Sequence, residues 1–132
     1  MSTFVDTSAL LAVLDAGDPQ NEAVTVVWRQ LVTAETELVC TNYILVEALA
    51  LIQHRLGLAA VRTFQDDLAP VLTIEWIDAQ QHARSVAALL TAGRRQLSLV
   101  DCSSFETMRS LGINEAFTLD RHFAEQGFNC VP

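Results

Sequence analysis

The stretch Thr3-Phe4-Val5-Asp6-Thr7-Ser8 decides the fold class, because it places an acid and two hydroxyl residues directly after a short apolar run. We expect residues 3–6 to form a strand and one of the two hydroxyl residues to cap a short helix that reaches Leu14. The Gly17-Asp18-Pro19 sequence should then end this helical stretch. A strand that leads straight into a helix is typical of an α/β fold.

The rest of the chain alternates strand-like apolar runs with helical patterns, which predicts a central, mainly parallel sheet flanked by helices. The expected helices cover residues 20–34, 42–56, 58–68, 79–92 behind a capping Asp78, 101–111, and a helical turn at 121–126. The remaining expected strands cover residues 38–41, 71–77, 115–119 and 128–131. No repeat or long linker interrupts this order, so residues 1–132 are expected to form one domain.

The composition supports this expectation, since 51% of the residues are hydrophobic and 18% are charged. No apolar run reaches the roughly 18 residues that span a bilayer, so we expect no membrane segment. The start of the chain lacks the basic segment of a secretory signal. The three cysteines show no Cys-x-x-Cys spacing, which argues against a zinc or redox motif and favours reduced thiols in a cytoplasmic protein.

The net charge of −8 by itself argues against nucleic-acid binding, because phosphates need cations. If four of the 16 acids face a metal, however, 12 acids oppose eight cations and only −4 is left. All eight cations are arginines. The absence of lysine argues against a response-regulator receiver and a haloacid-dehalogenase-like phosphatase, and no P-loop or Gly-x-Ser-x-Gly motif is present.

Three acids stand out because they follow predicted strands or begin a predicted helix. Asp6 and Asp120 each come at the end of a strand-like run, and Asp101 opens the helix after Leu97-Ser98-Leu99-Val100. Ligands of open α/β sheets bind outside the carboxyl ends of the strands, and the positive end of a helix keeps an aspartate ionised. Helix capping and turn formation are the alternative roles of these three acids.

A fourth acid, Glu47, is the only charge in the segment Tyr43–Ile52. A helix that is apolar nearly all round is expected to be buried on most faces. A buried carboxylate is costly unless it is paired or binds a metal. The alternative to metal binding is an ion pair with an arginine such as Arg109.

Four carboxylates without a cysteine or histidine cage suit Mg²⁺ or Mn²⁺ better than zinc. A hard cation held by carboxylates is suited to phosphoryl chemistry, because it can activate a water and offset charge on the leaving oxygen. The sequence thus points to a metal site at the carboxyl edge of the sheet.

The motifs around these acids resemble, in their order and spacing, those of PIN-domain nucleases, and among them the toxins of VapBC-type toxin–antitoxin pairs. The segments that carry the resemblance span nearly the whole chain: Phe4–Ser8, Val46-Glu47, Leu97–Asp101 and Phe117–Phe123. The resemblance implies a PIN-like three-layer fold and an endoribonuclease dependent on Mg²⁺ or Mn²⁺. Its metal-binding and catalytic residues would be Asp6, Glu47, Asp101 and Asp120.

Further residues are candidates for contact with the substrate or with the metal ligands. Thr7 and Thr118 match polar positions near the metal site of the family, with helix capping and strand propensity as their alternative roles. Arg94 and Arg95 precede Asp101 in a basic loop, where they could bind RNA phosphates or form a solvated charge pair. His122 could touch the substrate or be a surface histidine.

The resemblance also implies a cognate antitoxin as partner, with an arginine that enters the acidic site. The chain has more apolar residues than its predicted stripes need, for example Val26 and Leu58, which favours a homodimer. Two alternatives stay open: an RNA-processing PIN nuclease without an antitoxin, and a non-catalytic PIN-like binding module.

Overall fold

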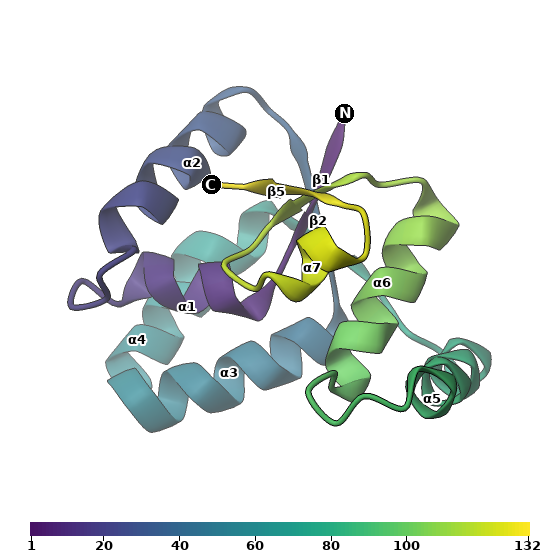
Figure 1. Cartoon of the computed structure of the whole chain (residues 1–132). Helices are drawn as coiled ribbons and strands as arrows, with labels where there is room; N and C mark the ends of the chain where they lie inside the picture. Colours follow the sequence, from purple (N-terminus) through teal and green to yellow (C-terminus); the bar gives the residue numbers. More distant parts are fainter.

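The centre of the molecule is a five-stranded sheet with the order β3-β2-β1-β4-β5, seen in a computed structural model that describes all 132 residues (Figure 1). Every neighbouring pair of strands is parallel. The strands are β1 (Ser2–Val5), β2 (Glu37–Thr41), β3 (Leu72–Glu75), β4 (Glu115–Phe117) and β5 (Asn129–Val131). The parallel sheet predicted from the alternating pattern is therefore confirmed.

Seven α-helices surround the sheet, and Figure 1 shows α2 and α4 on one side of it and α5 with α6 on the other. They are α1 (Thr7–Leu14), α2 (Asn21–Thr33), α3 (Asn42–Leu56), α4 (Leu58–Thr63), α5 (Ala79–Ala92), α6 (Leu99–Leu111) and α7 (His122–Glu125). No helix combines the length and apolar character that a bilayer crossing requires.

The expected helix over residues 58–68 is only half right, since α4 ends at Thr63 and is followed by a π-helical turn, η1 (Phe64–Leu68). A 3-10 turn, η2 (Ala69–Val71), then leads into β3. Phe64 and Leu68, the first and last residues of η1, are both buried. The wider turn thus points both apolar side chains at the core, which a regular periodicity in the sequence does not reveal.

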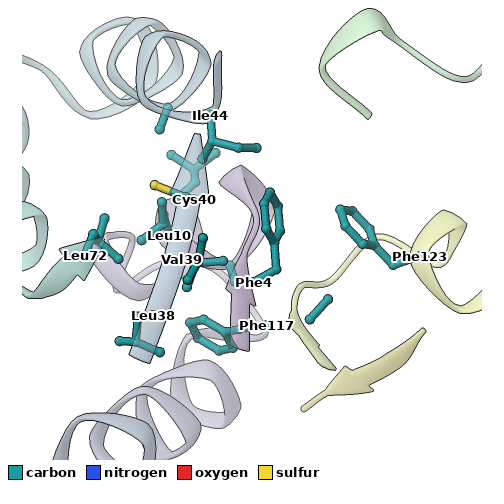
Figure 2. Packing of buried hydrophobic residues seen from close by; sticks show 14 of the residues in the cluster. Phe4, Leu10, Leu38, Val39, Cys40, Ile44, Leu72, Phe117 and Phe123 are labelled. Carbon is teal, nitrogen blue, oxygen red and sulfur yellow. The ribbon is translucent and has the colours of Figure 1, made fainter. Parts of the chain in front are cut away.

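The core lies on both faces of β1, where Thr3, Phe4 and Val5 are fully buried. A central strand of a parallel sheet is covered by helices on both sides, so all its side chains must pack. The Phe4 ring lies 6.3 Å from the ring of Phe123 in α7, which Figure 2 shows next to the sheet. Burial of a phenylalanine of this kind stabilises the fold by about 1.5–3 kcal/mol.

The chain runs outward from β1 in both directions: β2 and β3 lie on one side of it, and β4 and β5 on the other. Strand order therefore reverses between β1 and β4, at the position where open α/β sheets bind ligands. The two strand ends are joined there, since the Asp6 amide donates a 3.0 Å hydrogen bond to the Phe117 carbonyl. Residues directly after β1 and β4 meet at this carboxyl edge.

Candidate active site

A cavity of about 380 Å³ opens at the carboxyl edge of the sheet, where β1 and β4 meet. Its twelve lining residues come from α1 and the loop behind it, from α3, from the start of α6 and from the loop after β4. The structure brings the four acids selected from the sequence into this cavity, together with Thr7 and a fifth acid: Asp6, Thr7, Asp18, Glu47, Asp101 and Asp120.

Asp6 is the most buried of these acids, with 5% of its surface exposed. Its Oδ2 atom accepts hydrogen bonds from Ser8 Oγ at 2.6 Å and from Thr118 Oγ1 at 2.9 Å. Burial raises the pKa of Asp6 to about 6, because desolvation outweighs the hydrogen bonds from Ser8 and Thr118; the nearby charge of Asp101 raises it further. No hydrogen bond reaches Oδ1, so this oxygen is available to a cation.

The hydroxyl oxygens of Ser8 and Thr118 lie 3.2 Å apart beside the ends of β1 and β4, and each donates its proton to Asp6 Oδ2. Ser8 Oγ also accepts a hydrogen bond from the Leu119 amide, and Thr118 Oγ1 accepts one from the Asp120 amide, each at 2.9 Å. Thr118 therefore orients two acids at once. The sequence suggested this residue as a neighbour of the metal site, whereas it suggested Ser8 only as a helix cap.

Asp120 lies three residues beyond the end of β4 and is held by α7. Its Oδ1 atom accepts a 2.9 Å hydrogen bond from the His122 amide and lies 2.8 Å from His122 Nδ1. Asp101, Asp120 and His122 each present a potential ligand atom, and these atoms lie within 4.8 Å of one another. His122 thus belongs to the acidic cluster, which its position two residues after Asp120 indicated only weakly.

Asp101 lies in the first turn of α6, which begins at Leu99 and not at Asp101 as predicted. Ser98 is the N-cap: its Oγ accepts a 3.1 Å hydrogen bond from the Asp101 amide, while Asp101 Oδ2 accepts one of 3.0 Å from the Ser98 amide. This capping box satisfies two backbone donors and fixes the carboxylate at the positive helix end. Its Oδ1 atom has no hydrogen-bond partner in the protein.

Glu47 differs from its prediction, because it is partly exposed and not buried. α3 buries only the stripe that contains Ile44, Ala48 and Ile52, and Val46 on another face is 69% exposed. The small fold has too few elements to cover an apolar helix on every face. Glu47 makes no ion pair, and Arg109, its suggested partner, instead donates a hydrogen bond to Gln126.

The donor set of this cavity fits a divalent cation of the Mg²⁺ type. Asp6, Asp101 and Glu47 each retain at least one carboxylate oxygen without a hydrogen bond from the protein. Thr7 Oγ1 is also buried and has no hydrogen-bond partner. Several uncompensated carboxylates in one cavity repel one another, and an unpartnered buried hydroxyl is uncommon, so a bound cation with its waters would satisfy both.

The basic loop is not part of the cavity lining. Arg94 forms a surface ion pair with Glu125 at 3.3 Å, and Arg95 is exposed. Two charged residues of the cavity were missed by the sequence reasoning, Asp18 and Arg55. Asp18 lies in a turn-forming sequence, which gave no sign of a role in the site. Arg55 follows Glu47 at a helical spacing that puts both on one face of α3, so its sequence position could have indicated that it lies near the acids.

Comparison with known proteins gives a consistent result. Residues 3–129 match the family model of the PIN domain. The chain is 31% identical over 126 residues to the 23S rRNA-specific endonuclease VapC20 of Mycobacterium tuberculosis. The aligned residues make up 95% of this chain and 94% of that protein.

Two solved structures share the fold. The crystal structure of Mycobacterium tuberculosis VapC20, described as a sarcin-ricin loop cleaving toxin, matches with a TM-score of 0.84 at 30% identity over 96% of both chains. FitAcB from Neisseria gonorrhoeae matches with a TM-score of 0.70 at 15% identity, over 98% of this chain and 96% of that chain. This second likeness concerns the fold alone.

Proposed function

Because the chain belongs to the PIN-domain family of nucleases, we propose that it is a metal-dependent endoribonuclease that acts as the toxin of a type II toxin–antitoxin module. The resemblance first seen in four short motifs is confirmed by the family match. The observation that carries the proposal is the convergence of Asp6, Glu47, Asp101 and Asp120 on one cavity. We take residues 1–132 as one nuclease domain, consistent with one sheet and one core.

PIN nucleases use a divalent metal, and we assign Mg²⁺ or Mn²⁺ because the donors in the cavity are carboxylates. Asp6 and Asp101 would bind the cation directly, while Glu47 and Asp120 would act through water. Once bound, such a cation lowers the pKa of a coordinated water and offsets charge on the phosphate.

The residues of this chain would divide the remaining work. Ser8 and Thr118 hold the buried Asp6 carboxylate in a fixed orientation through their hydrogen bonds to Oδ2. Glu47 is partly exposed and free of partners, so it can approach the attacking water and accept its proton. Asp120 is oriented by His122, whose ring and amide both lie at its Oδ1 atom.

The substrate that we propose first is ribosomal RNA, because the relative at 31% identity is a 23S rRNA-specific endonuclease. Arg94 and Arg95 would contact RNA phosphates outside the cavity. Arg94 would have to leave its exposed pair with Glu125, and surface pairs of this kind contribute little stability.

We also propose two protein partners in the cytoplasm, a cognate antitoxin and a second copy of the chain. Apolar side chains exposed on α2, α3 and α4 support this proposal: Val26 is 50% exposed, and Val46 and Leu58 are each 69% exposed. Phe64, close to Leu58 in the sequence, is fully buried and belongs to the core, so it is not part of this surface. An arginine from an antitoxin could form ion pairs in the cavity, because five carboxylates line it.

The direct test of the proposed function is cleavage of purified 23S rRNA by the isolated chain, with the new RNA ends mapped by primer extension. We expect discrete internal cuts with Mn²⁺ and none with EDTA. Co-expression with a short upstream reading frame should abolish the toxicity of the chain. A folded, Mn²⁺-loaded chain that leaves RNA intact would instead indicate a non-catalytic binding module.

A further inference from the structure

We propose that Arg55 binds the RNA phosphate next to the one that is cleaved, an inference that rests on the proposed function. The cavity contains five acids and a single cationic side chain, which is Arg55. RNA is a polyanion, so a strand that enters this cavity meets repulsion from every carboxylate that the metal does not neutralise. A cation in the lining lowers this repulsion at one defined phosphate.

The position of Arg55 on α3 indicates which phosphate this is. Glu47, Leu51 and Arg55 follow one another at intervals of four residues, lie on the same face of the helix and all line the cavity. Eight residues correspond to about 12 Å along the helix axis. Arg55 is therefore too far along α3 to contact the cleaved phosphate, which would lie at the Glu47 end. A long side chain on a helix leans toward the helix N-terminus, so the Arg55 side chain is expected to reach toward the phosphate next to the cleaved one.

The guanidinium of Arg55 is free to bind a ligand. No carboxylate lies within 4.0 Å of it, and the ion pairs of the protein involve Arg94, Arg121 and His122 instead. Arg55 also makes no side-chain hydrogen bond, and its residue is exposed. An unpaired arginine presents a planar set of donors that matches two phosphate oxygens.

The fold tolerates a free cation at this place for a separate reason. Arg55 lies in the last turn of α3, directly before Leu56 and the C-cap Gly57. The C-terminal end of a helix carries partial negative charge, which stabilises a cation nearby. The positive charge can thus be held beside the acids without an ion pair that would block it.

The test is RNA binding by the full chain in an Asp101→Asn background, which prevents cleavage of the probe. The probe is a labelled single-stranded RNA oligonucleotide, and its sequence is unimportant because phosphate contacts are sequence-independent. Adding Arg55→Gln should weaken binding about tenfold and reduce the salt dependence by roughly one phosphate contact, a slope change of about 0.7. Arg62→Gln is the matched control: it removes the same charge from an exposed arginine in α4, outside the cavity, and should bind RNA like its parent.

A second measurement excludes an indirect effect through the metal or the fold. With Asp101 intact, Arg55→Gln should bind Mn²⁺ at least as tightly as the parent, because it removes a positive charge near the cation site. Equal RNA affinities of the Arg55→Gln and Arg62→Gln chains would overturn the proposal, and so would a failure of the Asp101→Asn chain to bind RNA. A parent chain that binds RNA but never cleaves it would defeat the proposed function alone, and the binding comparison would still decide the role of Arg55.

Discussion

Thr118 Oγ1 donates a 2.9 Å hydrogen bond to Asp6 Oδ2, and so links two residues that are 112 positions apart in the sequence. The same hydroxyl accepts the amide of Asp120, so one side chain positions two of the four acids. Thr118 is 3% exposed, which protects both bonds from water. The alignment of the cavity thus depends on a polar contact between the ends of β1 and β4.

Thr118→Val should test this link, because it keeps the shape of the side chain and removes the hydroxyl. We expect a loss of about 1–3 kcal/mol in the free energy of unfolding, since the Asp120 amide and the Asp6 carboxylate both lose a partner. RNA cleavage should fall about tenfold as the acids lose their orientation. Thr73→Val on the exposed face of β3 is the control, and an equal response of the two variants in denaturant unfolding would contradict the assigned role.

The raised pKa of Asp6 predicts a pH dependence of stability in the metal-free protein. Its pKa is about 6 in the folded chain, against an ordinary value of 3.8 for an exposed aspartate, so the folded chain holds a proton on Asp6 more tightly than the unfolded chain. The resulting stability is full below pH 4 and is lost as the pH rises through 6. The difference of about two pKa units corresponds to about 3 kcal/mol.

Urea unfolding of the parent and of Asp6→Asn in EDTA, between pH 4 and 7.5, tests the direction of this pH dependence. The quantity compared is the free energy of unfolding. The parent should lose stability relative to the variant across this range. If the free energies of unfolding of the two chains changed in parallel with pH, ionised Asp6 would not destabilise the folded chain.

A bound metal should offset, at neutral pH, the loss of stability that the ionised Asp6 carboxylate causes. We expect Mn²⁺ to raise the melting temperature of the parent, because a ligand that binds only the folded state stabilises it by about 2.7 kcal/mol at a hundred times its dissociation constant. Asp6→Asn and Asp101→Asn should respond much less. Differential scanning fluorimetry at increasing Mn²⁺ measures this, and identical shifts in all three chains would place the metal elsewhere.

The exposed apolar residues predict association of the isolated chain. Light scattering at tens of micromolar should give twice the monomer mass of 14.5 kDa. Leu58→Glu should shift the chain toward the monomer without unfolding it, because Leu58 is 69% exposed. A monomeric parent at this concentration would defeat the homodimer, and it would leave the nuclease assignment standing.

Much of the fold and of the site could be predicted because both depend on local patterns. Asp6 follows β1, Asp120 follows β4 after a short loop, and the carboxyl ends of parallel strands share one edge of the sheet. Acids at strand ends therefore converge wherever the strand order reverses. Gly57 and Gly112 marked the ends of α3 and α6, and Asp78 marked the start of α5. The hydroxyl cap expected for α1 was wrong, because Asp6 caps this helix by accepting the Ser8 amide.

The errors arose where tertiary contacts decide the outcome. An apolar helix sequence does not distinguish burial in the core from an exposed apolar face, so Glu47 was expected to be buried although it lies partly exposed at the cavity. Asp18 reaches the cavity through the chain reversal between α1 and α2, and α1 packs against both α2 and α3, which no local spacing around Asp18 indicates. Arg55 differs, because its helical spacing from Glu47 was an available signal. The π-helical turn at Phe64 likewise follows from packing of the core.

The central claim is that the acids of the cavity hold a metal that cleaves RNA, and the most direct measurement is the Mn²⁺-dependent cleavage rate of Asp101→Asn against Asp78→Asn. Both aspartates accept hydrogen bonds within a capping box, at α6 and α5 respectively, and asparagine can serve in both places, but only Asp101 lines the cavity. Asp101→Asn should lose roughly a hundredfold or more in rate, while Asp78→Asn cleaves like the parent. Undiminished cleavage by Asp101→Asn, in a chain that still needs Mn²⁺, would contradict the account.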